Sequence, residues 1–331
     1  MRIRLFATPR GAARALAADI TRALAANPRL VLGLPTGRTP IPLYRELIVR
    51  CRAHRIDLSR STTFNLDEFL GLPASHPSSY RSFMQRHLFD HVNLPARRIH
   101  FLNGAAVDLD RECARYERAI ARAGGIDLQI LGLGANGHIG FNEPAAALVA
   151  PTHSTRLTTV TRRANAALFG HRARAVPRGA LSMGMAAILQ ARRIVLLATG
   201  PGKARAVRRM IEGRVTPRVP ASFLQLHGDV EVWLDRTAAS GLQAARRRRA
   251  GKARRHRNRG GRANAAGPAL NGPADGTPLR WGRPFQGRPT GPPGHGASVR
   301  WSSSFRRAST SSPMASRITS CERRSRASAF E

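Results

Sequence analysis

The sequence predicts an α/β fold of three layers, in which helices cover both faces of a mostly parallel, Rossmann-like sheet. Short apolar runs alternate with segments of helical periodicity over the first 237 residues, as is typical of parallel β-α-β units. Glycine-rich turns follow some of these apolar runs, and α/β proteins bind ligands at such turns. The chain of 331 residues is long enough for one large domain or two small ones.

Six segments are expected to form strands. Residues 2–7 alternate between charged and apolar side chains, which indicates an edge strand. The other five are short apolar runs, as expected of parallel strands that are buried on both faces. They occupy residues 30–34, 62–66, 127–133, 193–198 and 230–234.

Six further segments are expected to form helices. The alanine-rich residues 12–26 are followed by Asn27 and Pro28, which end a helix. Pro40 is suited to the first position of the next one, because its fixed φ fits a helix and its missing N–H is not needed there. The remaining helices are predicted at residues 40–53, 78–89, 108–123, 180–190 and 203–212.

Two segments depart from this alternation. Residues 145–177 are polar and rich in Thr and Arg, and we expect this lid segment to be mobile and to cover a site. Residues 241–331 have no periodicity, and the excess of basic residues is concentrated toward this end. The chain has 35 basic and 16 acidic residues up to residue 237, and 20 basic and 3 acidic residues after it. Such a tail is expected to stay disordered.

The composition also bounds the surroundings in which the protein works. Cys51, Cys113 and Cys321 have no spacing typical of a metal or redox site, so we expect a reducing cytoplasm and no metal. The chain contains no apolar run of the roughly 18 residues that a membrane span requires. We therefore expect no membrane association.

The most informative stretch is residues 131–144, Leu-Gly-Leu-Gly-Ala-Asn-Gly-His-Ile-Gly-Phe-Asn-Glu-Pro. It follows a predicted buried strand and places four glycines, Asn136, His138 and Glu143 on the turn that leaves this strand. His138 and Glu143 carry groups that can transfer protons near neutral pH. This stretch resembles the signature of the glucosamine-6-phosphate deaminase family.

Five further stretches resemble that family in the same order along the chain, so that the resemblance covers residues 1–240. They are Leu-Gly-Leu-Pro-Thr-Gly-Arg-Thr-Pro at 32–40, Phe-Asn-Leu-Asp-Glu-Phe-Leu-Gly-Leu at 64–72, His-Pro-Ser-Ser-Tyr-Arg-Ser-Phe-Met at 76–84, Leu-Ala-Thr-Gly-Pro-Gly-Lys-Ala at 197–204 and Pro-Ala-Ser-Phe-Leu-Gln-Leu-His at 220–227. The tail differs, because family members end with a further helix. Its Arg-, Gly-, Pro- and Ala-rich composition is what a GC-rich gene yields when read out of frame, and we interpret it as a frame-shifted ending.

The resemblance implies a cofactor-free enzyme that converts glucosamine 6-phosphate and water to fructose 6-phosphate and ammonia. Asp67, at the end of a predicted strand and beside apolar neighbours, is expected to be the enolisation base. The adjacent Glu68 should point the other way. His138 is expected to open the sugar ring, and Glu143 to orient its imidazole. Asn136 stands where some members have Asp, and it can form hydrogen bonds but cannot accept a proton.

The phosphate of the substrate is expected at two helix starts. Thr36, Gly37, Arg38 and Thr39 lie between a strand and a helix, where free N–H groups attract anions. Lys203 begins a later helix and resembles the phosphate-binding lysine of the family. In the lid segment, Ala167 replaces an arginine that typically clamps the phosphate, and Arg162 or Arg163 is one helical turn away.

Two other functions fit parts of the sequence. A sugar-phosphate enzyme of the same fold, such as a 6-phosphogluconolactonase, is one alternative, but that branch does not usually carry the Asn142-Glu143 pair. A protein that binds nucleic acid through its basic tail is the other. The first 240 residues contain no nucleic-acid module, so any such binding is expected to be nonspecific. The sequence is also compatible with a homo-oligomer.

Overall fold

The computed structural model of the chain describes residues 1–243. Within them a seven-stranded sheet has the order β1-β10-β9-β6-β2-β3-β5, and all neighbouring strands are parallel. Its strands are β1 (Arg2–Phe6), β2 (Val31–Leu34), β3 (Thr62–Asn65), β5 (Ile99–His100), β6 (Leu128–Leu131), β9 (Arg193–Ala198) and β10 (Val230–Asp235). The predicted fold class is confirmed. The predicted disorder of the tail concerns residues that lie almost wholly outside this description.

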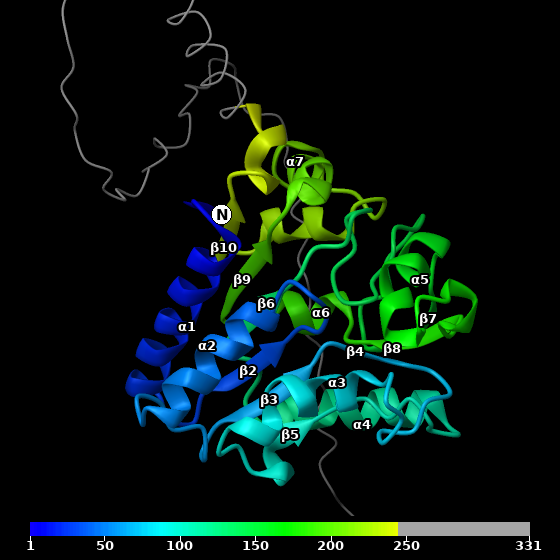
Figure 1. The fold of residues 1–331 in the computed structure, drawn as a ribbon. Helices are drawn as coiled ribbons and strands as arrows, with labels where there is room; N and C mark the ends of the chain where they lie inside the picture. The colour runs from blue at the N-terminus through cyan, green and yellow to red at the C-terminus, as the bar shows by residue number, and fades with distance from the viewer. Residues whose placement is uncertain (244–331) are drawn as a thin grey trace, which may run out of the picture. The chain divides into compact units, whose positions relative to one another are not determined.

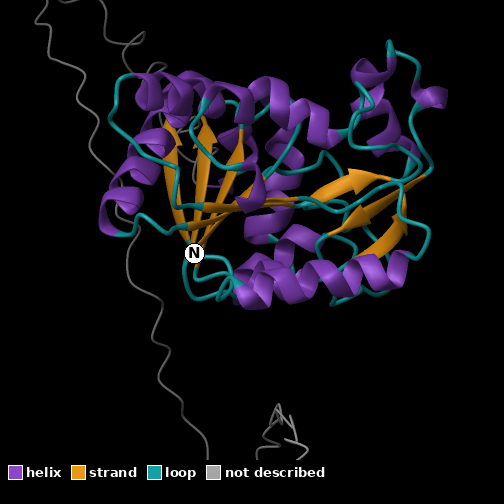
Figure 2. Ribbon diagram, turned by 90° about the horizontal axis from the view of Figure 1, so that it is seen from below, coloured by secondary structure: helices purple, strands orange, loops and turns teal. Residues whose placement is uncertain are grey.

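A second, antiparallel sheet has the order β4-β8-β7 and lies beside the first (Figure 2). Its strands are β4 (Asp67–Phe69), β7 (His153–Arg156) and β8 (Gly179–Ser182). The helices are α1 (Pro9–Ala26), α2 (Ile41–Arg52), α3 (Tyr80–His87), α4 (Leu109–Arg122), α5 (Thr159–Asn165), α6 (Met185–Leu189) and α7 (Ala204–Glu212). Short 3-10 turns connect them at Phe89–His91, Ala96–Arg98, Ala166–Phe169, Ala173–Ala175, Pro201–Lys203, Pro220–Leu226 and Ala238–Gly241.

Strand side chains alternate between the two faces of the large sheet, and each face has its own layer of helices (Figure 1). Val195 and Leu197 of β9 belong to a core with side chains of α1, α2 and α3. Ile194 and Leu196 belong to a second core with side chains of α4, α6 and α7. Because both faces are buried, the strands read as continuous apolar runs, which is why the sequence predicts them.

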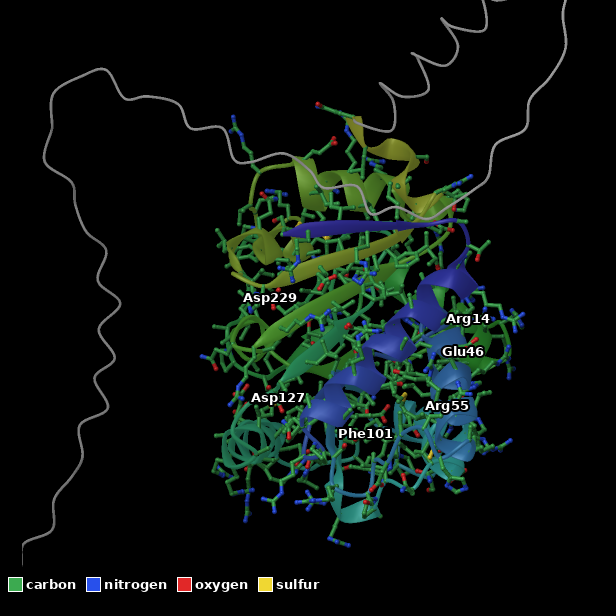
Figure 3. All side chains as sticks on the ribbon, turned by 90° about the vertical axis from the view of Figure 1, so that its left-hand side faces the viewer. Arg14, Glu46, Arg55, Phe101, Asp127 and Asp229 are labelled. Atoms are coloured by element: carbon green, nitrogen blue, oxygen red, sulfur yellow. The ribbon has the colours of Figure 1, made fainter. Side chains whose placement is uncertain are left out.

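The two ends of the parallel strands differ in character. Asp127 and Asp229, labelled in Figure 3, precede β6 and β10 at the amino ends of the strands. Arg192 lies 3.1 Å from Asp127, and Arg2 lies 2.6 Å from Asp229. These arginines are largely exposed, so their ion pairs add little stability. The turns at the carboxyl ends of the strands contain glycines such as Gly37, Gly134 and Gly200 and most of the predicted site residues.

Eleven of the twelve predicted strands and helices occur within a few residues of their predicted bounds, and among them residues 2–6 form the edge strand β1. The helix predicted at residues 180–190 is wrong in its first half. Residues 179–182 form β8, which pairs with β4 and β7, and only Met185–Leu189 is helical. Ala180 and Leu181 point into different cores, an alternation that partners distant in sequence impose.

The lid segment is partly built into the small sheet. Its strand β7 pairs with β8, and α5 follows directly. Figure 1 shows α5 and β7 on the side of the fold away from α1 and α2. No helix within residues 1–243 is long and apolar enough to cross a membrane.

One glycine near the start of α6 supports a stability prediction. A Cβ at Gly184 would lie 2.1 Å from the carbonyl oxygen of Pro151 and 2.2 Å from that of Ala150, and backbone oxygens cannot rotate away. We expect Gly184→Ala to lower the free energy of unfolding by roughly 2–3 kcal/mol, the upper range for overpacking. The control is Gly228→Ala, whose Cβ would meet nothing within 4 Å. Equal denaturation midpoints for the two variants would contradict this packing.

Candidate functional site

A cavity of about 480 Å³ lies at the carboxyl ends of the parallel strands. Its walls come from the turns after β2, β3, β6 and β9, together with α3 and α5. Ligand sites of open α/β sheets occur at this edge, because the turns there bring polar groups together. Its polar or ionisable lining side chains are those of Thr36, Arg38, Thr39, Asp67, Tyr80, His138, Thr161, Asn165, Thr199 and Lys203.

Asp67 is the carboxyl group of this cavity, and it is only 5% exposed. Its Oδ1 atom makes no hydrogen bond to any residue in the described part of the chain. Burial raises the pKa of Asp67 to about 8, the nearby Glu68 adds to the increase, and a hydrogen bond with Thr36 opposes it. A carboxyl group with this pKa is only partly ionised near neutral pH, but its ionised form is a stronger base than an ordinary aspartate.

An apolar wall of aromatic rings accompanies this carboxyl group. Phe69, Tyr80 and Phe141 are buried, and their ring centroids lie 4.6 to 5.6 Å apart. The hydroxyl of Tyr80 donates to Oδ1 of Asn165 at 2.8 Å, which joins α3 to α5. Desolvation of this kind disfavours the charged form of a carboxyl group and is the main cause of the raised pKa.

Asp67 and Glu68 line different cavities, because adjacent side chains of a strand point to opposite faces. Its Oε1 accepts hydrogen bonds from the N–H groups of Phe69 and Tyr80 at 2.9 and 2.8 Å, and its Oε2 from that of Arg81 at 2.9 Å. Burial raises the pKa of Glu68 to about 7, and these three donors oppose the increase. Glu68 therefore acts as a structural anchor for the start of α3.

Buried hydroxyl groups hold the strand ends on which the cavity is built. The hydroxyl of Tyr44 donates to the carbonyl of Pro35, and that of Tyr116 donates to the carbonyl of Asn65. The amide of Asn65 donates to the carbonyl of Leu34 at 3.1 Å. These bonds connect the ends of β2 and β3 to helices on opposite faces of the sheet, so the turns that follow have fixed starting points.

The turn after β6 presents His138 to the cavity. A Cβ at residue 134 would lie 2.4 Å from three atoms of the imidazole ring, so only glycine lets the ring lie against this backbone. Gly140 has a φ of 57°, which glycine adopts without strain. Behind the turn, the amide of Asn142 donates to the carbonyls of Ile139 and Met183 at 3.0 and 2.9 Å and fastens the turn to β8.

Glu143 and Asn136 lie behind the imidazole rather than in the cavity wall. Oε2 of Glu143 lies 3.6 Å from Nδ1 of His138 and accepts a hydrogen bond of 2.8 Å from the amide of Asn136. Burial opposes ionisation of Glu143, but His138, Thr161 and Asn136 outweigh it and lower the pKa of this carboxyl group. An ionised Glu143 favours a proton on Nδ1 and leaves Nε2 as an acceptor.

A positive region forms at another part of the cavity wall. Thr36, Gly37, Arg38 and Thr39 line the cavity just before α2, and Lys203 lines it just before α7. Burial lowers the pKa of Lys203, and the nearby Arg38 lowers it further. Two cations that repel each other beside two helix starts form a favourable site for an anion.

Asp235, at the end of β10, holds the turn that carries Lys203. It is buried, and its carboxylate accepts hydrogen bonds from the N–H of Gly200 at 3.2 Å and from that of Ala238 at 2.7 Å. The hydroxyl of Thr237 also donates to it. The role of Asp235 could not be predicted from the sequence, because a single Asp at a strand end carries no distinctive spacing.

The structure therefore brings the predicted site residues to one place. Seven line the cavity, and Asn136 and Glu143 support His138 from behind. Tyr80, Thr161, Asn165 and Thr199 also line it but were not predicted. Tyr80 and Thr199 lie within stretches quoted above, yet only folding shows that their side chains reach this cavity.

Neither arginine near Ala167 reaches this cavity in the described structure. Arg162 donates instead to the carbonyls of Val176 and Arg174, both at 3.1 Å, and these bonds hold the lid segment together. The expectation that Arg162 or Arg163 supplies the missing clamp has no support in this arrangement.

Comparison with known proteins agrees with the geometry. The family model described as "Glucosamine-6-phosphate isomerases/6-phosphogluconolactonase" matches residues 7–233. A glucosamine-6-phosphate deaminase of Thermoanaerobacter sp. (strain X514) is 49% identical over 214 residues, which cover 65% of this chain and 84% of the relative. One from Clostridium perfringens (strain 13 / Type A) is 46% identical over 232 residues, 70% of this chain and 94% of the relative.

Solved structures show the same likeness. A monomeric glucosamine-6-phosphate deaminase superposes with a TM-score of 0.71 at 41% identity, over 73% of this chain and all of the other. A 6-phosphogluconolactonase from Thermotoga maritima superposes with a TM-score of 0.57 at 20% identity, over 71% and 98% of the two chains, and shares the fold alone. This chain belongs to the glucosamine-6-phosphate isomerase/6-phosphogluconolactonase family.

Proposed function

We propose that this protein is a glucosamine-6-phosphate deaminase, which converts glucosamine 6-phosphate and water to fructose 6-phosphate and ammonia. One observation carries the proposal: a buried carboxyl group with a raised pKa shares a cavity with an imidazole and a pair of cations. The relatives that carry this name are 46–50% identical to the chain. The cavity supplies one group for each step of the reaction.

The phosphate binds first in this scheme, because it is the largest charge on the substrate. Arg38 and Lys203 neutralise it, and N–H groups before α2 donate hydrogen bonds to it. Binding at this end places the sugar ring across the cavity toward His138 and Asp67. Every residue in this scheme comes from the same chain.

His138 then opens the sugar ring. With the proton on Nδ1 beside Glu143, Nε2 accepts the proton of the anomeric hydroxyl. The same imidazole returns a proton to the ring oxygen as the bond between this oxygen and C1 breaks. A neutral imidazole can accept a proton at one nitrogen and then donate it, which suits both halves of this transfer.

Asp67 completes the reaction on the open chain. Its carboxylate removes the proton from C2, the carbon that bears the amino group, and a proton is then added at C1. The resulting imine at C2 takes up water, and ammonia leaves to give the ketone of fructose 6-phosphate. The high basicity of a buried carboxylate favours the first of these steps.

The cell compartment and the assembly are part of the same proposal. Amino-sugar phosphates are internal metabolites, and the free thiols of Cys51 and Cys113 suit a reducing compartment. We propose that the protein acts in the cytoplasm on a small-molecule substrate. A similar structure is described as monomeric, and we propose that a single chain is active in the same way.

Asp67→Asn tests the assignment of the base, because it removes the proton acceptor with little change in volume. We expect the unaltered protein to release ammonia from glucosamine 6-phosphate and to exchange the C2 hydrogen with solvent. Asp67→Asn should lower both rates at least roughly 10²-fold, the lower range for an acid–base group. Glu68→Gln is the matched control. If Glu68→Gln lost the exchange of the C2 hydrogen and Asp67→Asn kept it, Glu68 rather than Asp67 would be the base.

The raised pKa of Asp67 also predicts how stability depends on pH. Below its ordinary value of 3.8, Asp67 is protonated in both folded and unfolded chains. Between 3.8 and about 8 only the unfolded chain ionises, so the contribution of Asp67 to stability is lost as the pH rises through this window. Asp67→Asn should therefore be more stable than the unaltered protein, by a margin that grows from about pH 5 to about pH 8. Thermal unfolding over this range measures the margin, and a margin independent of pH would contradict the assignment.

Ala167 predicts weak binding of the phosphate. If Ala167→Arg supplies a charge-assisted hydrogen bond worth about 1.5 kcal/mol, KM should fall roughly tenfold. The control is Ala175→Arg, which adds the same charge at another exposed position of the lid segment. An equal change in KM for both variants would show a general effect of charge, and an unchanged KM for Ala167→Arg would show that residue 167 does not face the phosphate.

A further inference from the structure

The first turn of α5 touches the back of the His138–Glu143 pair. The hydroxyl oxygen of Thr161 lies 3.3 Å from Nδ1 of His138. The hydroxyl oxygen of Thr158 lies 3.3 Å from both carboxylate oxygens of Glu143 and 3.2 Å from that of Thr161. Thr161 is fully buried. Two hydroxyl groups of the lid segment therefore meet the two ionisable groups of the turn after β6.

Thr161 is the closer hydrogen-bonding partner of the imidazole. The separation of 3.6 Å between Nδ1 and Oε2 of Glu143 is too long for a good hydrogen bond. A hydrogen bond from Thr161 also lowers the pKa of Glu143. The hydroxyl oxygen of Thr161 has lone pairs with which it can accept the proton of Nδ1. The hydroxyl of Thr161 thus lies between Nδ1 and the hydroxyl of Thr158, which contacts the carboxylate.

Helix capping explains only part of this arrangement. Thr158 is the N-cap of α5, and its hydroxyl accepts a hydrogen bond from the N–H of Thr161 at 3.3 Å. Capping requires nothing of the side chain of Thr161. A buried hydroxyl has to be satisfied, and here its partners are the imidazole and the hydroxyl of Thr158.

We propose that Thr161, supported by Thr158, is a positioning residue for His138, which selects the Nδ1–H tautomer and so leaves Nε2 free toward the cavity. The expected effect on the rate of ammonia release rests on the proposed function, whereas the expected tautomer of His138 does not. Since the two threonines lie at the start of α5, the imidazole is aligned only when the lid segment lies against the turn after β6. Substrate binding and ring opening are thereby linked.

Other charged groups around the imidazole belong to separate elements. Glu143 comes from the same turn, Asp67 from β4, Arg38 from the turn before α2 and Lys203 from the turn before α7. Only Glu143 among these lies within 4.0 Å of an imidazole nitrogen. The selection of a tautomer is therefore expected to depend on Glu143 and Thr161 rather than on the cations.

The first test observes the ring of His138 in the free protein. Nitrogen-15 NMR distinguishes the two neutral imidazole tautomers, and the signal that is absent in His138→Gln identifies this ring. We expect the Nδ1–H form in the unaltered protein and in Thr159→Val, which changes an exposed threonine of the same helix. Thr161→Val, which keeps the shape but removes the hydroxyl, should lose this preference. An unchanged tautomer in Thr161→Val would overturn the proposal.

The second test measures ammonia release. Thr161→Val should lower kcat roughly tenfold, which is less than the ~10²–10⁴-fold that the acid–base group itself supplies, and should change KM much less. Thr161→Ser and Thr161→Ala both lose the methyl group and differ only in the hydroxyl, so they decide the question if the valine variant does not fold. The serine variant should keep most of the activity, and the alanine variant should not.

A double variant separates positioning from a general loss of structure. In the His138→Gln background, Thr161→Val should have no further effect on kcat, because the two residues act through the same group. Additive losses would overturn the proposal, as would equal kcat values for Thr161→Val and Thr159→Val. An unaltered protein that releases no ammonia would refute the proposed function instead, and the NMR comparison would still decide the role of Thr161.

Discussion

The burial of the Asp67 side chain away from water is the physical constraint on which the site depends. A buried carboxylate close to a second carboxyl group loses hydration that a single hydrogen bond does not replace. The neighbouring Glu68, by contrast, accepts three hydrogen bonds from backbone N–H groups. One carboxyl group of the pair therefore holds the structure together, and the other remains available for chemistry.

The parallel sheet makes this arrangement possible. It gathers the turns after four of its strands at one edge, and each turn contributes side chains to the same cavity. The turns after β2 and β9 contribute cations and helix starts, and the turn after β6 contributes the imidazole. Side chains on the far sides of these turns, such as Tyr44 and Asp235, fix their positions. The cavity can then bind the anionic end of a small molecule and transfer protons at the other end of the same molecule.

Much of this could be predicted from the sequence, for physical reasons that differ from part to part. Strands buried on both faces leave apolar runs, and glycines such as Gly134 mark places where a ring lies against the backbone. The quoted stretches supplied Asp67, His138 and Lys203, all of which line one cavity. The strand β8 could not be predicted, because Ala180 and Leu181 have no strand signal apart from their partners in β4 and β7. Thr161 and Asn165 were missed for the same reason, since their roles arise only when α5 lies against segments far away in the sequence.

The most direct test of this account is the titration of Asp67 itself. Carbon-13 NMR of the aspartate carboxyl groups in the free protein, with Asp67→Asn to assign the signal, follows the ionisation of this residue. The account predicts that the signal of Asp67 changes around pH 8. A change centred near the ordinary value of 3.8 would show that Asp67 is well solvated in the folded protein, and the proposed base would then lack the property on which its role depends.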